Sequence, residues 1–286
     1  MNKIIVPTDF SSTAAAALRY GHFLAQATGL ELEVIHVHDG YGHSESPDVK
    51  KGSMEARQTA QRRIDEFIRF NVLTPVGEGP AEPEATIGSK EITGAPSDVL
   101  IAASRDKTTS LIVMGGVGSG VVSTVTPFFG SVAKTVAKGA ECPVLLVPKD
   151  YKEPSLKRAS IAFDEANGLR ETSKGFDFLR IPLKPAMRFV HVRDMSEKTE
   201  ARKEIGLMEK ILNTGFPGYP VELDLLDPGV TALQLLEYTN EQGVDLLVMG
   251  HRKRSFFKRL FTHSQTAQVV DYTGVPLLVI PIQDYA

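Results

Sequence analysis

Short apolar runs alternate with amphipathic stretches along the first half of the chain. The runs have strand length and are rich in β-branched residues, whereas apolar residues in the longer stretches recur with a helical period. The expected strands are residues 3–7, 31–38, 84–92, 111–114 and 143–147, and the expected helices are residues 13–27, 54–72, 96–105 and 131–138. Strands that alternate with helices predict an α/β domain built of right-handed βαβ units, with a parallel sheet.

The second half of the chain repeats this pattern. IIVPTDFS is echoed by ASIAFDEA, VIHVHD by FVHVRD, SLIVMGG by DLLVMGH, and CPVLLVP by VPLLVIP. Asp9 lies 155 residues before Asp164, and the third pair of segments is offset by 135 residues. Matching segments in the same order, at piecewise constant offsets, indicate a tandem duplication. We therefore expect two five-stranded domains, residues 1–150 and 151–286.

Composition restricts the classes of partner. The 286 residues carry a net charge of −3, so no excess positive field favours nucleic acid or a membrane surface. Cys142 is the single cysteine, which excludes an intrachain disulfide and fits a reducing compartment. No apolar run approaches the length of a membrane span. These features favour a soluble, cytoplasmic protein that binds neither nucleic acid nor membrane.

A glycine-rich segment is the strongest candidate for binding chemistry. The buried strand at 111–114 leads into Gly115, Gly116, Gly118 and Gly120, and Gly130-Ser131 then begins a helix. Glycines let backbone N–H groups approach an anion, and a helix N-terminus adds unpaired N–H donors. The segment therefore predicts a phosphate cradle, and a flexible surface turn is the alternative reading.

Other candidates are expected at the same edge of the sheet. Asp9 follows the first strand, Val37 lies near the end of the second and Gly115 follows the fourth. Ligands of open parallel sheets bind beyond the carboxyl ends of the strands, where the strand order reverses. These three residues therefore meet in one crevice if the first and fourth strands are neighbours. Asp9 has a second reading as a helix-capping residue.

On these segments and motifs, the chain resembles the universal stress protein family in its tandem two-domain form. The resemblance implies two tandem Rossmann-like domains, each a five-stranded parallel sheet with helices on both faces. ATP-binding members carry the motif G-x2-G-x9-G-[S/T]; here Gly115-x2-Gly118 is followed by eleven residues before Gly130-Ser131. The resemblance implies an adenine and ribose side formed by Pro7, Thr8, Asp9 and Val37. It implies a ribose and phosphate side formed by Met114, Gly115, Gly118, Gly130, Ser131 and Val132.

The function implied by the resemblance is a stress-response regulator that binds ATP or another adenine nucleotide, with or without Mg²⁺, at one site in the first domain. In the second copy, Lys253 and His263 replace two motif glycines, so we expect this degenerate domain to bind no ATP. The resemblance also implies an unidentified protein partner and an intrachain pseudo-dimer through the final strands, residues 144–147 and 277–280. The resemblance is also compatible with a homodimer of two chains.

Two other function classes remain open. One is a nucleotide-free interaction protein of the stress response. The other is a slow ATPase or phosphotransfer enzyme, which only the resemblance supports. The chain contains neither the P-loop motif nor a G-x-S-x-G elbow, so we name no catalytic residue. His36 and His38 share one face of a strand and are expected to be structural rather than metal ligands. The basic segment 252–259 reads as a solvated loop or as an anion or partner site.

Overall fold

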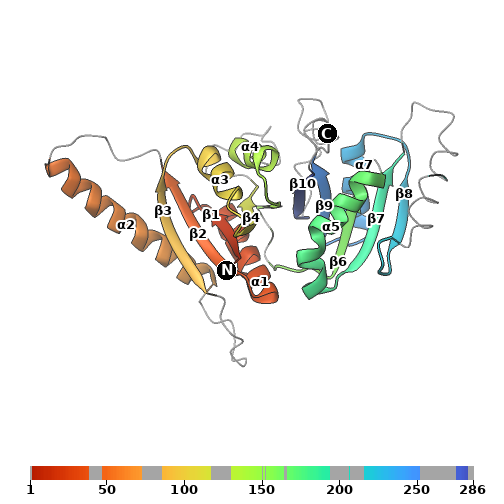
Figure 1. Ribbon diagram of the computed structural model, residues 1–286, viewed down its shortest axis with the longest axis horizontal. Coiled ribbons are helices and arrows are strands. Elements are labelled where there is room, and N and C mark those ends of the chain that lie inside the picture. Colours follow the sequence, from red (N-terminus) through yellow and green to blue (C-terminus); the bar gives the residue numbers. More distant parts are fainter. Residues whose placement is uncertain are drawn as a thin grey trace, which may run out of the picture. The chain divides into compact units, whose positions relative to one another are not determined.

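The computed structural model describes residues 2–38, 47–72, 86–116, 130–149, 151, 153–163, 166–193, 206, 216–251 and 275–282. The chain divides into two compact units, and the second contains Ser155–Ala286. Each unit contains strands and helices of an α/β fold (Figure 1).

The first unit contains five described strands in the spatial order β3-β2-β1-β4-β5. Its strands are β1 (Lys3–Pro7), β2 (Glu31–His38), β3 (Ile87–Thr93), β4 (Thr109–Gly115) and β5 (Val144–Val147). Its helices are α1 (Ser12–Thr28), α2 (Pro47–Val72), α3 (Pro96–Ser104) and α4 (Ser131–Gly139). All four strand pairings are parallel.

The second unit has the equivalent order β8-β7-β6-β9-β10, again with parallel pairings. Its described strands are β6 (Arg158–Ala162), β7 (Ala186–Val192), β8 (Glu222–Leu226), β9 (Leu246–His251) and β10 (Leu277–Pro281). Its labelled helices are α5 (Ala166–Leu183) and α7 (Thr231–Glu241). The predicted fold class, two tandem five-stranded parallel-sheet domains, is therefore confirmed.

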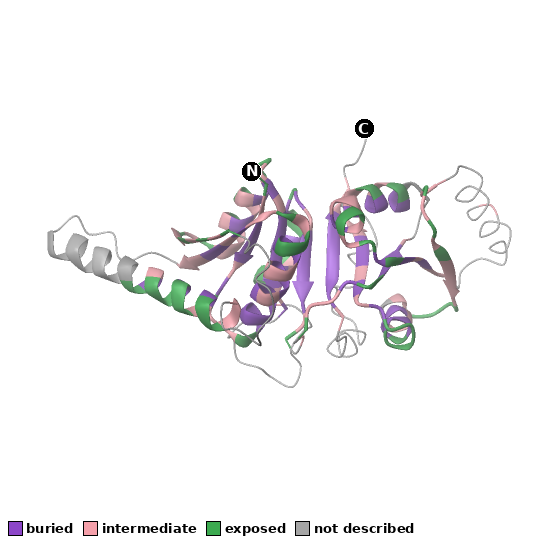
Figure 2. Cartoon of the chain, turned by 90° about the horizontal axis from the view of Figure 1, so that it is seen from below, coloured by how far each residue is buried: buried purple, intermediate pink, exposed green. Residues whose placement is uncertain are grey.

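The core of the first unit is a sheet covered on both faces. Helix α1 packs with α2, and α3 packs with α4. Three successive residues of β1, namely Ile4, Ile5 and Val6, are at most 1% exposed. Neighbouring side chains of a strand point to opposite faces, so both faces of β1 are covered. Figure 2 shows the same concentration of buried residues on the central strands.

The expected elements agree with the structure except at some ends. β1 and β2 have the expected bounds, whereas β3 begins at Ile87 rather than at residue 84. The larger correction concerns α2, which was expected to begin at residue 54 but already begins at Pro47. Proline suits the first position of a helix. Gly52 and Ser53, which are typical of loops, concealed this signal for the beginning of a helix.

A polar network inside the second unit joins strands β6, β7 and β8 to helix α7. The Arg188 guanidinium donates to both oxygens of Asp224 at 2.7 and 2.8 Å. The Tyr238 hydroxyl donates to the same carboxylate at 2.8 Å and lies 3.1 Å from the hydroxyl of the fully buried Ser160. Burial raises the pKa of Tyr238 to about 12, so the phenol stays protonated and can donate.

Replacing Asp224 with Asn is expected to destabilise the second unit at neutral pH and to have little effect in acid. Hydrogen bonds from Arg188 lower the pKa of the Asp224 carboxyl in the folded protein. Its stabilising contribution is therefore present above the ordinary aspartate pKa and is lost as the pH falls through the lowered folded-state value. Urea unfolding of both proteins over a pH series measures this difference.

Asp227→Asn is the matched control for this measurement. The Asp227 side chain is 85% exposed in its ion pair with Arg193, and exposed pairs contribute little to stability. If the difference in free energy of unfolding between wild type and Asp224→Asn stayed constant with pH, it would contradict a stabilising role of the ionised Asp224 carboxylate.

Candidate functional site

The strand order of the first unit reverses between β1 and β4. These two strands pair in parallel, with Ile4 opposite Leu111 and Ile5 opposite Ile112. The connections of the sheet leave in opposite directions at this point, which opens a crevice beyond the carboxyl ends of the two strands. The condition set by the sequence, that the first and fourth strands are neighbours, is met.

A cavity of about 350 Å³ lies at this edge. Its volume falls within the range of small-molecule sites. Nine of the ten predicted site residues line it, namely Pro7, Thr8, Asp9, Val37, Met114, Gly115, Gly130, Ser131 and Val132. The tenth, Gly118, lies outside the described residues. Gly116, one of the glycines of the predicted phosphate cradle, lines it as well, and five further lining residues were not predicted: Thr13, Ala14, Pro96, Leu100 and Ala133.

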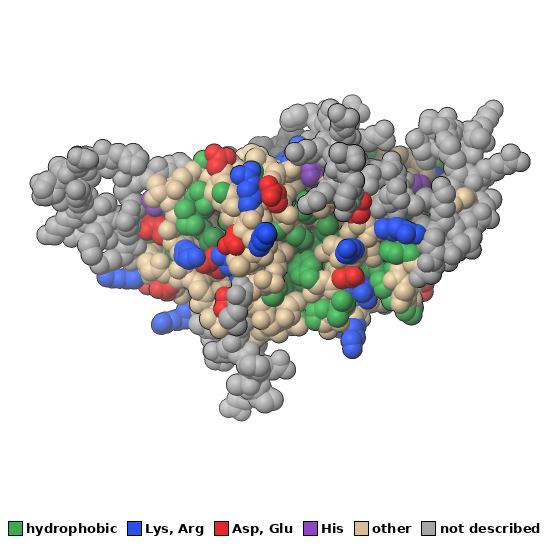
Figure 3. All heavy atoms as spheres, viewed as in Figure 1, with side chains coloured by type: hydrophobic (Ala, Val, Ile, Leu, Met, Phe, Trp, Pro, Cys, Tyr) green, Lys and Arg blue, Asp and Glu red, His purple; other side chains and the backbone are tan. Residues whose placement is uncertain are grey.

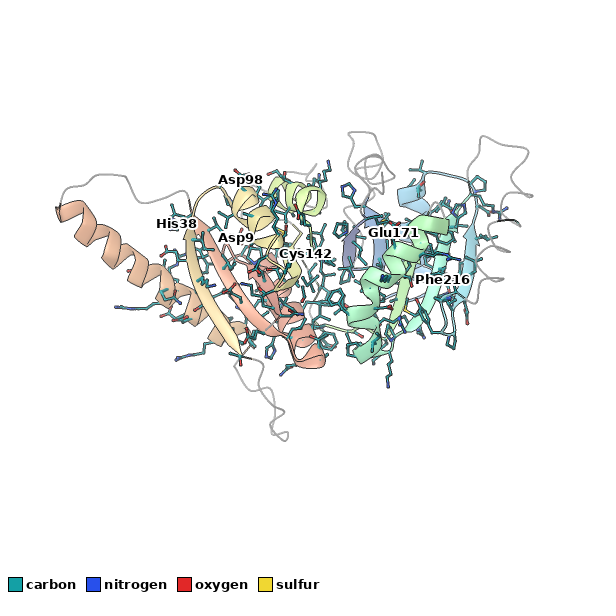
Figure 4. All side chains as sticks on the ribbon, in the orientation of Figure 1. Asp9, His38, Asp98, Cys142, Glu171 and Phe216 are labelled. Atoms are coloured by element: carbon teal, nitrogen blue, oxygen red, sulfur yellow. The ribbon has the colours of Figure 1, made fainter. Side chains whose placement is uncertain are left out.

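Thr8 and Asp9 occupy a hydrogen-bonded turn between β1 and α1. Thr8 is 6% exposed, and its hydroxyl accepts a hydrogen bond from Phe10 N–H at 2.9 Å. The exposed Asp9 accepts from Ser11 N–H at 3.0 Å through one carboxylate oxygen. The N-cap of α1 is Ser11, whose hydroxyl accepts from Ala14 N–H at 3.2 Å, so the reading of Asp9 as the helix cap is wrong, and its bond to Ser11 belongs to the turn before the helix. The place of Asp9 on the cavity wall is compatible with ligand contact (Figure 4).

Gly115 lies against the backbone at the beginning of α1. A Cβ atom at this position would stand 2.6 Å from both the carbonyl carbon and the carbonyl oxygen of Thr13. Glycine is therefore required here for the packing of α1 on β4, independently of any ligand. This packing also brings Thr13 and Ala14 to the cavity wall.

Gly130 is in a different situation. It is the N-cap of α4, with φ −60° and ψ 163°, a conformation open to any residue. A Cβ atom would meet only the Gly116 carbonyl oxygen, at 3.7 Å, which is an ordinary contact. The Gly130 N–H donates to that same oxygen at 2.6 Å. Nothing among the described neighbours requires glycine here, and the missing side chain leaves the first turn of α4 open toward the cavity.

Two described positions at the corresponding edge of the second unit can be compared with those of the first. Gly250 is retained, and a Cβ atom there would stand 2.3 Å from side-chain atoms of Thr172 and Ile282. At the offset of 155 residues, the fully buried Leu169 takes the place of the cavity-lining Ala14. Bulkier side chains therefore take up space at this edge of the second unit.

The remaining features of the second-copy motif are not described. Lys253, His263 and the basic segment 252–259 lie outside the described residues. The expectation that the second domain binds no ATP stays a prediction.

The histidines of β2 make separate contacts. His36 Nδ1 lies 2.9 Å from the Thr8 carbonyl oxygen, and His38 Nε2 lies 3.1 Å from a Glu91 oxygen. Figure 4 shows His38 and Asp98 at the edge where β2 ends and α3 begins. Within the described ranges, no three His, Cys, Asp or Glu side chains are placed to hold a metal ion.

Cys142 packs as a small buried residue. Burial raises the pKa of its thiol to about 12, so the group remains protonated and is a poor nucleophile. It does not belong to the lining of the cavity.

In the part of the chain that is described, no helix has the length and apolar character needed to cross a membrane. On the face shown in Figure 3, basic and acidic side chains are interspersed.

A repeated, doubly wound α/β unit with a cavity at its switch point defines the structural class. The profile of the universal stress protein family matches residues 1–148 and 178–281, and the chain belongs to this family. The matched segments cover most of both units.

Relatives of the chain include one- and two-unit proteins. A universal stress protein of Methanocaldococcus jannaschii is 30% identical over 154 residues, which cover 53% of this chain and 84% of the relative. A universal stress protein of Synechocystis is 21% identical over 292 residues, which cover 97% of this chain and 99% of the relative. The crystal structure of a universal stress protein from Archaeoglobus fulgidus, 19% identical, aligns with a TM-score of 0.68 and covers 98% of each chain. This structural likeness supports the tandem fold.

Replacing Gly115 with Ala is expected to lower the free energy of unfolding of the first unit by about 1–3 kcal/mol, because the added methyl group meets the Thr13 backbone. Chemical denaturation measures the change. Gly88→Ala is the matched control, since the nearest atom to its Cβ would be the Leu32 carbonyl oxygen at 3.9 Å. Equal stability of the two variants would show that Gly115 has no packing role.

Proposed function

We propose that the cavity of the first unit binds an adenine nucleotide, foremost ATP with Mg²⁺, and that the protein acts as a nucleotide-dependent regulator in the stress response. Membership of the universal stress protein family supports the assignment to stress response. The cavity supports nucleotide binding, because it is lined by nine of the ten nucleotide-site residues that the family resemblance implies.

The observation that carries the proposal is the contrast between Gly115 and Gly130. The fold requires glycine at position 115, where it packs on α1, but does not require it at position 130. A glycine that packing does not demand leaves room at the N-terminus of α4, where backbone N–H groups and the helix dipole favour an anion. Phosphate groups fit this end of the cavity, with the Ser131 hydroxyl as a further donor.

The cavity also has apolar lining that suits a base and a sugar. Its apolar side chains from β1, β2, α3 and β4 are Pro7, Val37, Pro96, Leu100 and Met114. Such surfaces accommodate a flat ring, while the Asp9 carboxylate can accept hydrogen bonds from ribose or adenine donors. The acidic Asp98 in the first turn of α3 disfavours phosphate at that helix and supports the same orientation of the nucleotide.

We propose further that the first unit holds the only functional site, and that a protein partner distinguishes the occupied from the empty form. Such signalling requires nucleotide affinity to differ between two conformations of the protein. A cytoplasmic location and pairing of the final strands of the two halves belong to the same proposal. Nucleotide binding alone is proposed, without an enzymatic step.

Introducing a negative charge at Ser131 is expected to weaken binding of Mg-ATP about tenfold or more, since the new carboxylate would stand where phosphates are expected. The Ser131→Asp variant should be no less stable than the wild type, because acidic residues in the first helical turn are favourable. Isothermal titration calorimetry and thermal unfolding of the full chain measure both quantities.

The control is Thr135→Asp, which adds the same charge one turn further along α4, at an exposed position outside the cavity lining. An equal loss of affinity in both variants, or none in Ser131→Asp, would contradict a phosphate site at the α4 N-terminus.

A further inference from the structure

The turn that carries Thr8 and Asp9 is tied to β2 by two hydrogen bonds. Thr8 N–H donates to the Ile35 carbonyl at 2.8 Å, and the Thr8 carbonyl oxygen lies 2.9 Å from His36 Nδ1. A carbonyl oxygen can only accept, so Nδ1 of His36 carries the proton and donates. The two bonds fix the peptide groups on both sides of Thr8, immediately before Asp9.

Phe10 secures the other side of the turn. It has a φ of 64°, in the left-handed region that residues other than glycine rarely adopt. Its ring lies 4.6 Å from the His36 ring and 5.7 Å, edge to face, from Phe67, and the Arg63 guanidinium lies 4.4 Å from its centroid. The ring thus covers the imidazole that holds Thr8, and links the turn to side chains of α2.

We propose that His36 is a positioning residue for nucleotide binding: by holding the Thr8 carbonyl, it presents Thr8 and Asp9 to the ligand in the cavity. This inference rests on the function proposed above. His36 itself is absent from the cavity lining, whereas its neighbour in sequence, Val37, belongs to it. Side chains alternate along a strand, so His36 acts from the opposite face of the sheet through the backbone of the turn.

The second unit contains the same bond. His191 Nδ1 donates to the Phe163 carbonyl at 2.9 Å, and in both units the partners are 28 residues apart. The Phe163 ring lies 5.2 Å from the His191 ring. The bond is therefore part of the fold in both units, and only in the first is it coupled to the proposed site. The duplication supplies an internal control.

The test compares His36→Ala with His191→Ala in the full chain, with Mg-ATP as the probe and calorimetry and thermal unfolding as readouts. We expect both variants to lose stability, because each lacks one partly buried hydrogen bond. Only His36→Ala should bind Mg-ATP more weakly, by about threefold to tenfold, the equivalent of one net hydrogen bond. His36→Asn, whose amide can donate from a similar position, should restore affinity.

The outcomes separate the inference from the proposed function. Absence of Mg-ATP binding by the wild type would overturn both. Binding by the wild type with unchanged affinity in His36→Ala, or an equal loss in His191→Ala, would overturn the positioning role alone. Should His36→Ala not fold, Phe10→Asn takes its place, since asparagine tolerates the left-handed conformation and removes the ring that covers His36. Weaker binding then supports the inference, and unchanged affinity overturns it.

Discussion

The parallel pairing of β1 with β4 is the constraint on which the candidate site depends. It sets the end of β1, with Thr8 and Asp9, beside the end of β4, with Gly115. It also requires α1 to begin directly above Gly115, where only a hydrogen fits beneath the Thr13 backbone. The cavity is the space that remains between this close packing and the first turn of α4.

The duplication separates what the fold needs from what a ligand needs. The second copy retains Gly250, where packing against Thr172 and Ile282 excludes a side chain. It has lost the glycine equivalent to Gly130, a position at which the first unit has room for a side chain. A motif glycine that serves packing persists in both copies, whereas one that serves only a ligand can be replaced where no ligand binds.

Much of the fold could be predicted from the sequence, because strand and helix periods were clear and the repeat gave a second reading of the same topology. The start of α2 was missed because apolar periodicity begins after Pro47. Site residues at strand ends were predictable from topology. Those contributed by helices, such as Thr13, Pro96 and Leu100, depend on how each helix lies on the sheet. Pro96 could have been predicted, because a proline that begins the helix after a strand lies near the carboxyl end of that strand.

The central claim is a single adenine-nucleotide site in the first unit. It is tested most directly by denaturing freshly purified protein, and then identifying and quantifying the released nucleotide by chromatography and mass spectrometry. The account predicts one adenine nucleotide for each chain, retained through purification or restored by incubation with Mg-ATP. Two nucleotides for each chain would contradict the silent second unit, and none under either condition would contradict nucleotide binding itself.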